Sequence, residues 1–192
     1  LLALLLEHPS IEIAGLFGSE RIEVGAQPTI DELHPRLAGR IHERVQRGEV
    51  AAIAACRPDA IMLAVPHGAS ATLVPALLEA TDAAILDLSG TWRLGSPSLI
   101  QRHYAAAVDP GLAAEAVYGL AELAHGRLTD AAAPPRLVAV AGCYPTASIL
   151  ALRPLSDAGL LGDRRVAIAA ASGVSGAGRG AGERTSFCNV SY

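Results

Sequence analysis

Short apolar runs alternate along this chain with stretches rich in alanine and leucine, and this alternation restricts the possible folds more than any other feature. Five runs predict strands, at residues 11–18, 59–68, 83–90, 136–142 and 164–173. Three of the intervening stretches predict helices, at residues 49–56, 69–80 and 147–155. A strand–helix–strand order favours parallel pairing. We therefore expect an α/β fold with a Rossmann-like, doubly wound parallel sheet.

Composition bounds the size of the core and the class of partner. The chain has 192 residues, of which 51% are hydrophobic, so it can bury one substantial core or two small ones. Its net charge of −4 is small and its basic residues are scattered, which excludes a strongly basic nucleic-acid or membrane surface. The apolar start at residues 1–9 is too short to span a bilayer and is interpreted as the end of a buried helix.

The cysteines indicate a reducing compartment. There are three, Cys56, Cys143 and Cys188, and they lie far apart with no spacing typical of zinc ligands or of a secreted disulfide framework. No targeting signal is visible, so we expect a cytoplasmic protein without a metal site. Cys56 is interpreted as a core or helix-end residue, and Cys188 has no assignment.

Small and polar residues follow four of the predicted strands. In a doubly wound sheet, ligands bind beyond the carboxyl ends of the strands, although ordinary strand-to-loop turns have the same composition. These residues are Gly18 to Arg21, Pro66 to Gly68, Ser89 with Gly90, and Gly142 with Cys143. Ser19 and Arg21 follow the strand that usually ends near the adenosine ribose, which favours NADP over NAD, and an exposed loop arginine is the alternative. His67 is a candidate cofactor contact or a turn histidine.

Cys143 is the candidate nucleophile. It stands between a predicted strand and Pro145, a residue favoured in the first turn of a helix. Unpaired N–H groups at a helix N-terminus favour a thiolate, and they can also stabilise an oxyanion on an attacked carbonyl. The alternative is a small buried apolar residue, as for most single cysteines.

A glycine-rich segment at residues 172–184 is the second candidate binding element. It holds five glycines together with Ser172, Ser175 and Arg179, and it does not match the G-x-G-x-x-G pattern. Such a loop lets the backbone approach a ligand closely, and a flexible connection is the alternative.

Two specific motifs extend this interpretation to a family. "AGCYPTASILALRPL" and, about thirty residues later, "SGVSGAGR" resemble the N-acetyl-γ-glutamyl-phosphate reductase family, the arginine-pathway branch of the semialdehyde dehydrogenase group. Further matching segments run in the family's order through nearly all of the chain. They are "LLLEHPSIEIAGL", "LHPRLAG", "VPHGASATLVPALLEA", "ILDLSGTWRL" and "AVYGLAEL".

The resemblance implies a domain organisation and a reaction. Residues 1–143 would form an NADP-binding Rossmann-like domain, and residues 144–192 would begin a second α/β domain for catalysis and dimerisation. The protein would be a homo-oligomer that reduces a small acyl phosphate to an aldehyde through a cysteine thioester, with NADPH as the reductant.

The resemblance also implies roles for individual residues. Cys143 would be the nucleophile, while Arg93, Gly142 and Tyr144 would contact the substrate. The residues implied beside the cofactor are Ser19, Arg21, Pro66, His67, Ser89, Ser172, Gly173, Ser175 and Gly176.

Several features depart from the family pattern. Val140 and Ala141 replace the Asn-Pro pair that commonly precedes Gly-Cys, and "DLSGTWRL" replaces the commoner DLSADFRL. We expect the first strand with its glycine turn to precede Leu1, and the histidine motif that supplies the acid/base to follow Tyr192, so that these residues alone would be inactive. Three alternatives stay open: an aspartate-semialdehyde type of dehydrogenase, a cysteine acyltransferase or hydrolase without a redox step, and an inactive nucleotide-binding fragment.

Overall fold

The computed structural model of the chain describes residues 1–18, 27–163 and 165–173. The chain divides into two compact units, Leu1–Ala141 and Gly142–Tyr192. The first unit contains every described strand, and the second contains one long helix followed by an extended segment.

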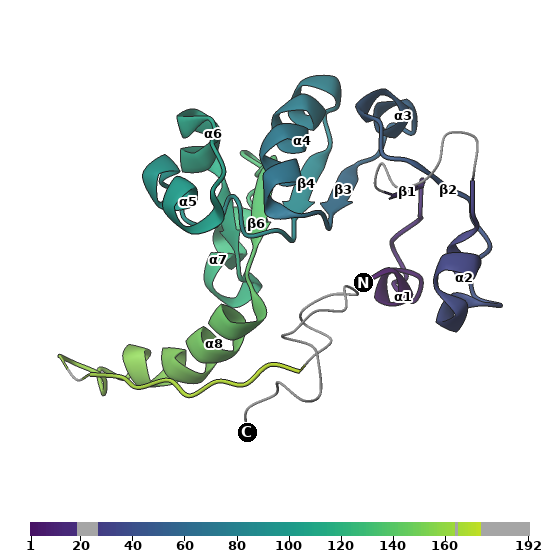
Figure 1. Cartoon of the computed structure of the whole chain (residues 1–192). Helices are drawn as coiled ribbons and strands as arrows, with labels where there is room; N and C mark the ends of the chain where they lie inside the picture. The colour runs from purple at the N-terminus through teal and green to yellow at the C-terminus, as the bar shows by residue number, and fades with distance from the viewer. Residues whose placement is uncertain (19–26, 164, 174–192) are drawn as a thin grey trace. The chain divides into compact units, whose positions relative to one another are not determined.

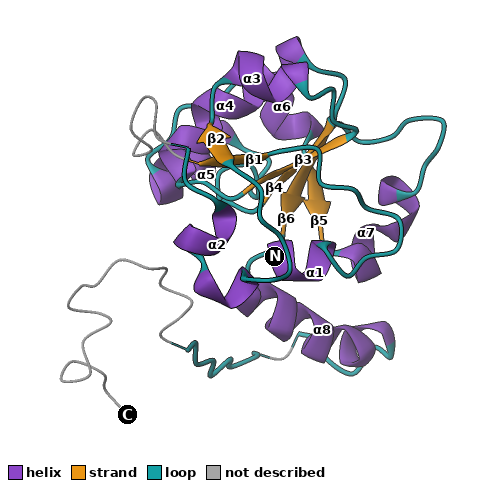
Figure 2. Cartoon of the chain, turned by 90° about the vertical axis from the view of Figure 1, so that its right-hand side faces the viewer, coloured by secondary structure: helices purple, strands orange, loops and turns teal. Residues whose placement is uncertain are grey.

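The described strands are all parallel and form two sheets (Figure 2). A two-stranded sheet pairs β1 (Leu16–Gly18) with β2 (Val45–Arg47). A four-stranded sheet has the order β3-β4-β6-β5, built from β3 (Ala60–Leu63), β4 (Ala84–Asp87), β5 (Val117–Gly119) and β6 (Leu137–Val140). The predicted α/β fold with a parallel sheet is therefore confirmed.

Helices connect these strands (Figure 1). They are α1 (Leu2–Leu5), α2 (Ile30–Leu33), the 3₁₀ turn η1 (Pro35–Leu37), α3 (Val50–Ala55), α4 (His67–Ala80), α5 (Pro97–Tyr104), α6 (Pro110–Glu115), α7 (Ala121–Leu128) and α8 (Cys143–Asp157). The three predicted helices are confirmed as α3, α4 and α8. Straight-chain apolar residues and alanine favour these helices, because they lose little side-chain freedom in the helical state.

The main core lies against the four-stranded sheet. Val74 and Leu77 of α4 pack on Ile85 of β4, and Ile100 of α5 joins the same cluster. All four side chains have no measurable exposure. Because β4 lies between β3 and β6, its apolar residues are covered from several directions, which is typical of a parallel sheet. This core holds the strands of the sheet in place, and with them the edge formed by their carboxyl ends.

Two interpretations of the sequence are wrong. The expected strand at residues 164–173 is not found among its described residues, 165–173, which are extended and exposed without a ladder. An extended run becomes a strand only when a neighbouring strand accepts its backbone hydrogen bonds, and no described segment does so here. The first helix is not buried either. Leu2 and Ala3 pack on a small separate core, whereas Leu1 and Leu4 are exposed.

Candidate active site

Cys143 is the first residue of α8 and is exposed to solvent. Gly142 is the N-cap, with extended backbone angles, and its carbonyl oxygen accepts the first helical hydrogen bond from the N–H of Thr146 at 2.9 Å. Pro145 has no N–H to donate. The backbone N–H groups of Cys143 and Tyr144 therefore have no acceptor among the described residues. Both lie in the turn that carries the sulfur, where unpaired N–H groups can hold a developing oxyanion.

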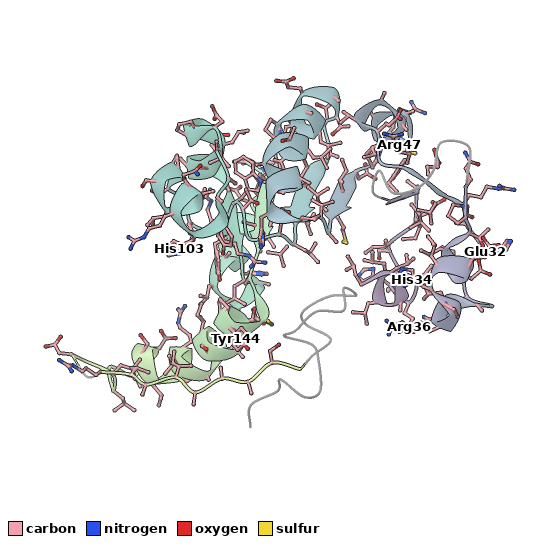
Figure 3. All side chains as sticks on the ribbon, viewed as in Figure 1. Glu32, His34, Arg36, Arg47, His103 and Tyr144 are labelled. Carbon is pink, nitrogen blue, oxygen red and sulfur yellow. The ribbon has the colours of Figure 1, made fainter. Side chains whose placement is uncertain are left out.

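An open groove of about 530 Å³ runs beside this helix turn within the second unit. Cys143, Tyr144 and Ser148 line it on the helix side, and Ser172 and Gly173 line it on the side of the extended segment. Tyr144 lies at the start of α8 and is 45% exposed (Figure 3). Four of the residues expected from the sequence therefore line one groove. Cys143 and Tyr144 come from α8, and Ser172 and Gly173 come from the glycine-rich segment.

The carboxyl edge of the four-stranded sheet holds a second group of expected residues. Pro66 is the N-cap of α4, and His67 is its first residue. The backbone N–H groups of His67 and Gly68 have no acceptor among the described residues, and a Cβ added at Gly68 would meet nothing within 4 Å. Free N–H donors beside open space at a helix N-terminus fit the phosphates or ribose of a nucleotide. The residues at this edge therefore fit a nicotinamide cofactor.

Ser89 is buried rather than open to the edge, with only 5% of its surface exposed. Its hydroxyl donates to Oδ2 of Asp87 at 2.7 Å, and its N–H donates to Oδ1 of Asp87 at 3.0 Å. The hydroxyl is thus occupied inside the protein. A cofactor at this edge would meet the backbone of the loop that follows β4 rather than this side chain.

Arg93 joins the ends of two strands. Its Nε donates to the carbonyl oxygen of Val140, the last residue of β6, at 2.7 Å. Its Nη2 donates to the carbonyl oxygen of Leu88, just after β4, at 2.9 Å. The other terminal nitrogen of the guanidinium, Nη1, has no hydrogen-bond partner among the described residues, so its donors are available to another group.

The remaining expected residues lie outside the described ranges. Ser19, Arg21, Ser175 and Gly176 belong to this group, as does Cys188. Cys56 is half-buried at the end of α3, where its thiol donates to the carbonyl oxygen of Ala52 at 3.6 Å. The interpretation of Cys56 as a helix-end residue is confirmed.

Sequence reasoning missed a polar cluster beneath this edge. Its members are Ser70, Asp87, Thr91 and Trp92, and all four are fully buried. A signal was present: Asp87 closes an otherwise apolar strand, and an acidic residue in such a run is rarely buried unless it has partners.

Comparison with known families gives two matches that together cover most of the chain. Residues 1–131 match the semialdehyde dehydrogenase NAD-binding domain. The chain belongs to the semialdehyde dehydrogenase family. Residues 143–192 match the semialdehyde dehydrogenase dimerisation domain. The second match begins at Cys143, the first residue of α8.

Individual relatives of this semialdehyde dehydrogenase chain agree in name. A protein of Tolumonas auensis is 41% identical over 197 residues, covering 99% of this chain and 56% of the relative. One of Pectobacterium carotovorum is 42% identical, covering 96% of this chain and 54% of the relative. One of Gloeobacter violaceus is 42% identical, covering 93% and 49%. All three are named N-acetyl-gamma-glutamyl-phosphate reductase. The chain spans about half the length of these curated relatives.

Proposed function

We propose that the protein reduces N-acetyl-γ-glutamyl phosphate to N-acetylglutamate semialdehyde, with Cys143 as the nucleophile. The observation that carries this proposal is the exposed thiol at the first residue of α8, beside two backbone N–H groups without acceptors among the described residues. The names of the relatives support the substrate.

The chemistry follows from the residues of this helix turn. The Cys143 thiolate attacks the acyl carbon, and the bond between that carbon and the phosphate oxygen breaks. Inorganic phosphate departs, and the acyl group stays on the sulfur as a thioester. The N–H groups of Cys143 and Tyr144 would hold the carbonyl oxygen as it gains negative charge. A bound nicotinamide cofactor supplies the hydride that reduces the thioester carbonyl. The resulting tetrahedral adduct on Cys143 collapses, which releases the aldehyde and restores the thiolate.

We propose that the cofactor is NADP. Pro66, His67 and the loop containing Ser89 would bind it at the sheet edge, and Ser172 and Gly173 would bind it in the groove beside Cys143. Ser19 and Arg21 are proposed for the 2′-phosphate, and Ser175 and Gly176 for the nicotinamide side. Arg93 would direct its outer nitrogen to the phosphate of the substrate, with Gly142 and Tyr144 beside the acyl chain.

We also propose a division of the chain and an assembly. Residues 1–143 would bind the cofactor, and residues 144–192 would begin the domain for catalysis and subunit contact, in keeping with the dimerisation match. The protein would be a cytoplasmic homo-oligomer, since reduced cysteines suit that compartment. Of the helices that the structure describes, none is long and apolar enough to cross a membrane.

The test uses the protein expressed from the entire reading frame in which this sequence lies, called here the full-frame protein. Given N-acetylglutamate semialdehyde, inorganic phosphate and NADP⁺, it should form NADPH, the reverse of the proposed direction. Cys143→Ser should lower the rate by about three orders of magnitude or more, as loss of a catalytic nucleophile does elsewhere. Cys56→Ser is the matched control and should keep the rate.

Two results would contradict the proposal. A Cys143→Ser variant with most of its activity would show that another group is the nucleophile. A clear preference for aspartate semialdehyde over N-acetylglutamate semialdehyde would assign the protein to the aspartate-semialdehyde type instead.

A further inference from the structure

Asp87 is a buried carboxylate whose partners are neutral donors. It is the last residue of β4 and has no measurable exposure. The hydroxyl of Ser70, on α4, donates to its Oδ2 at 3.0 Å. The hydroxyl and the N–H of Ser89 donate to Oδ2 and Oδ1 at 2.7 and 3.0 Å. A carboxylate removed from water is tolerated only when such donors replace its hydration, so these bonds are needed for the strand end to form as it does.

The hydrogen bonds between Asp87 and its neighbours are all donated to the carboxylate. The indole N–H of Trp92 can only donate, and it donates to Oγ of Ser70 at 3.0 Å. The proton of the Ser70 hydroxyl is therefore free to go to Asp87. Oγ of Ser89 accepts the N–H of Thr91 at 3.2 Å. The single proton of the Ser89 hydroxyl has two acceptors, Oδ2 of Asp87 at 2.7 Å and Oγ1 of Thr91 at 3.1 Å, and the shorter contact is the one to Asp87. Every donor in the cluster is satisfied only if Asp87 accepts at both oxygens.

The cluster reaches the sheet edge at His67. Asp87 fixes the N–H of Ser89, and the next N–H along the chain, that of Gly90, donates to Nδ1 of His67 at 2.8 Å. The hydroxyl of Thr91 donates to the carbonyl oxygen of His67, also at 2.8 Å. A nitrogen that accepts from a backbone N–H carries no proton, so the ring proton of neutral His67 lies on Nε2. The ring also packs on Tyr104, with 4.8 Å between ring centroids.

We propose that Asp87 is a positioning residue, which acts through Ser70 and Ser89 to hold the loop after β4 and to keep His67 as an Nε2–H donor for the cofactor. This inference rests on the proposed function, in which His67 lies beside NADP. It assigns to Asp87 a role in cofactor affinity without contact between Asp87 and the cofactor.

Asp87→Asn tests the proposal with little change in size. An amide presents N–H groups where the cluster needs an acceptor, so either Ser70 or Ser89 loses its partner and the N–H of Gly90 is no longer held against His67. In the full-frame protein, the KM for NADPH should rise by about tenfold, the effect of one displaced hydrogen bond, while kcat at saturating NADPH changes less than about twofold.

A second readout follows the ring itself. Nitrogen NMR of His67, recorded without cofactor, should report a single Nε2–H tautomer in the parent protein and a mixture of tautomers in Asp87→Asn. A purely structural role for Asp87 would lower stability without moving this signal. Ser70→Ala removes one of the donors to Asp87 and should shift both readouts in the same direction by a smaller factor, so it decides the matter if Asp87→Asn does not fold.

Thr81→Ala is the matched control. The Thr81 hydroxyl donates to the carbonyl oxygen of Leu77 at 2.9 Å, at the opposite end of α4 from His67. The Thr81 hydroxyl also accepts from the N–H of Ala83 at 3.4 Å, so this variant loses two hydrogen bonds away from the loop after β4. Both readouts should therefore stay at the parent values.

The proposal is overturned if Asp87→Asn keeps the KM for NADPH within about twofold and leaves His67 in one Nε2–H tautomer. An absence of NADP-dependent activity in the unmutated full-frame protein would contradict the proposed function instead. The tautomer measurement needs no cofactor, so it would still decide whether Asp87 holds His67.

Discussion

The bond between Trp92 and Ser70 allows a double-mutant test of the buried cluster. Ser70→Ala removes a hydroxyl that accepts from the Trp92 indole N–H and donates to Asp87, both at 3.0 Å, in a site with no measurable exposure. It leaves the indole N–H without an acceptor, which costs about 1–3 kcal/mol, and removes a donor to a carboxylate, worth about 1.5–3 kcal/mol. Since these terms overlap, we expect the free energy of unfolding to fall by about 3 kcal/mol.

Trp92→Phe should cost less. It removes the donor together with part of the ring, so Ser70 keeps its bond to Asp87 and no buried donor is stranded. A lost neutral hydrogen bond and a small cavity together amount to about 1–2 kcal/mol. In the double variant, no indole N–H remains to be stranded by the loss of the Ser70 hydroxyl. The double variant should therefore be less destabilised than the sum of the two single variants, by about 1–2 kcal/mol.

The assay is urea denaturation of the four proteins followed by far-UV circular dichroism, with equal m-values as the check that the unfolded states are comparable. Trp92 is the single tryptophan of the chain, so its fluorescence gives a second, local record for the parent and for Ser70→Ala. If the two single effects add within about 0.5 kcal/mol, the two side chains are not coupled and the assignment of donors and acceptors in the cluster is wrong.

Three further predictions concern other parts of the chain. Iodoacetamide should label Cys143 faster than Cys56 near neutral pH, because Cys143 is exposed at a helix N-terminus, and equal labelling by mass spectrometry would contradict this. The hydrogen bond and charge of Asp31 raise the pKa of His42, and the same contact lowers the pKa of Asp31. The pair therefore stabilises the fold fully between pH 3.8 and pH 6.5, the ordinary pKa values of the two groups. This stabilisation is lost as pH rises through the pKa of His42 or falls through the pKa of Asp31. Asp31→Asn should return the NMR-measured pKa of His42 toward 6.5. Gly90→Ala should lower the melting temperature, because its Cβ would overlap the ring of Tyr104, and an unchanged melting temperature would show that this ring moves aside.

The parts of the fold that sequence predicts are those where the apolar pattern is strong. The strands at 59–68, 83–90 and 136–142 are confirmed as the shorter β3, β4 and β6, whose apolar residues form near-continuous runs even though buried residues alternate in β3 and β4. β2 and β5 are missing from the prediction, since each has three residues and only one of them is buried. So short a segment has no period to detect, and its state depends on pairing with a distant strand.

Two helices missing from the prediction, α5 and α6, have local start signals in the sequence. Asp109 is the N-cap of α6, and its carboxylate accepts from the N–H of Leu112. Pro110 follows at the first helical position. α5 likewise begins with Pro97 after Ser96. Cap residues followed by proline predict a helix start even where the apolar pattern is weak.

In the candidate site, too, the sequence predicts the part that depends on local signals and misses the part that depends on long-range packing. A strand end, a glycine and a proline predict that Cys143 stands at a helix N-terminus, because each of these signals is local. The partners of Asp87 come from α4 and from the following loop, and their meeting depends on how the helix packs on the sheet. Long-range packing of this kind leaves one signal in the sequence, an acidic residue at the end of an otherwise apolar run.

The two sheets have a practical consequence for anyone who produces these 192 residues by themselves. β1 pairs only with β2, and β3 pairs only with β4, so in the described structure each of these strands has one lateral side without a ladder. Uncovered strand sides of this kind recruit strands from other molecules. Recombinant material should therefore tend toward inclusion bodies, and a solubility partner fused near β1 should improve the recovery of monodisperse protein more than one fused at the far terminus.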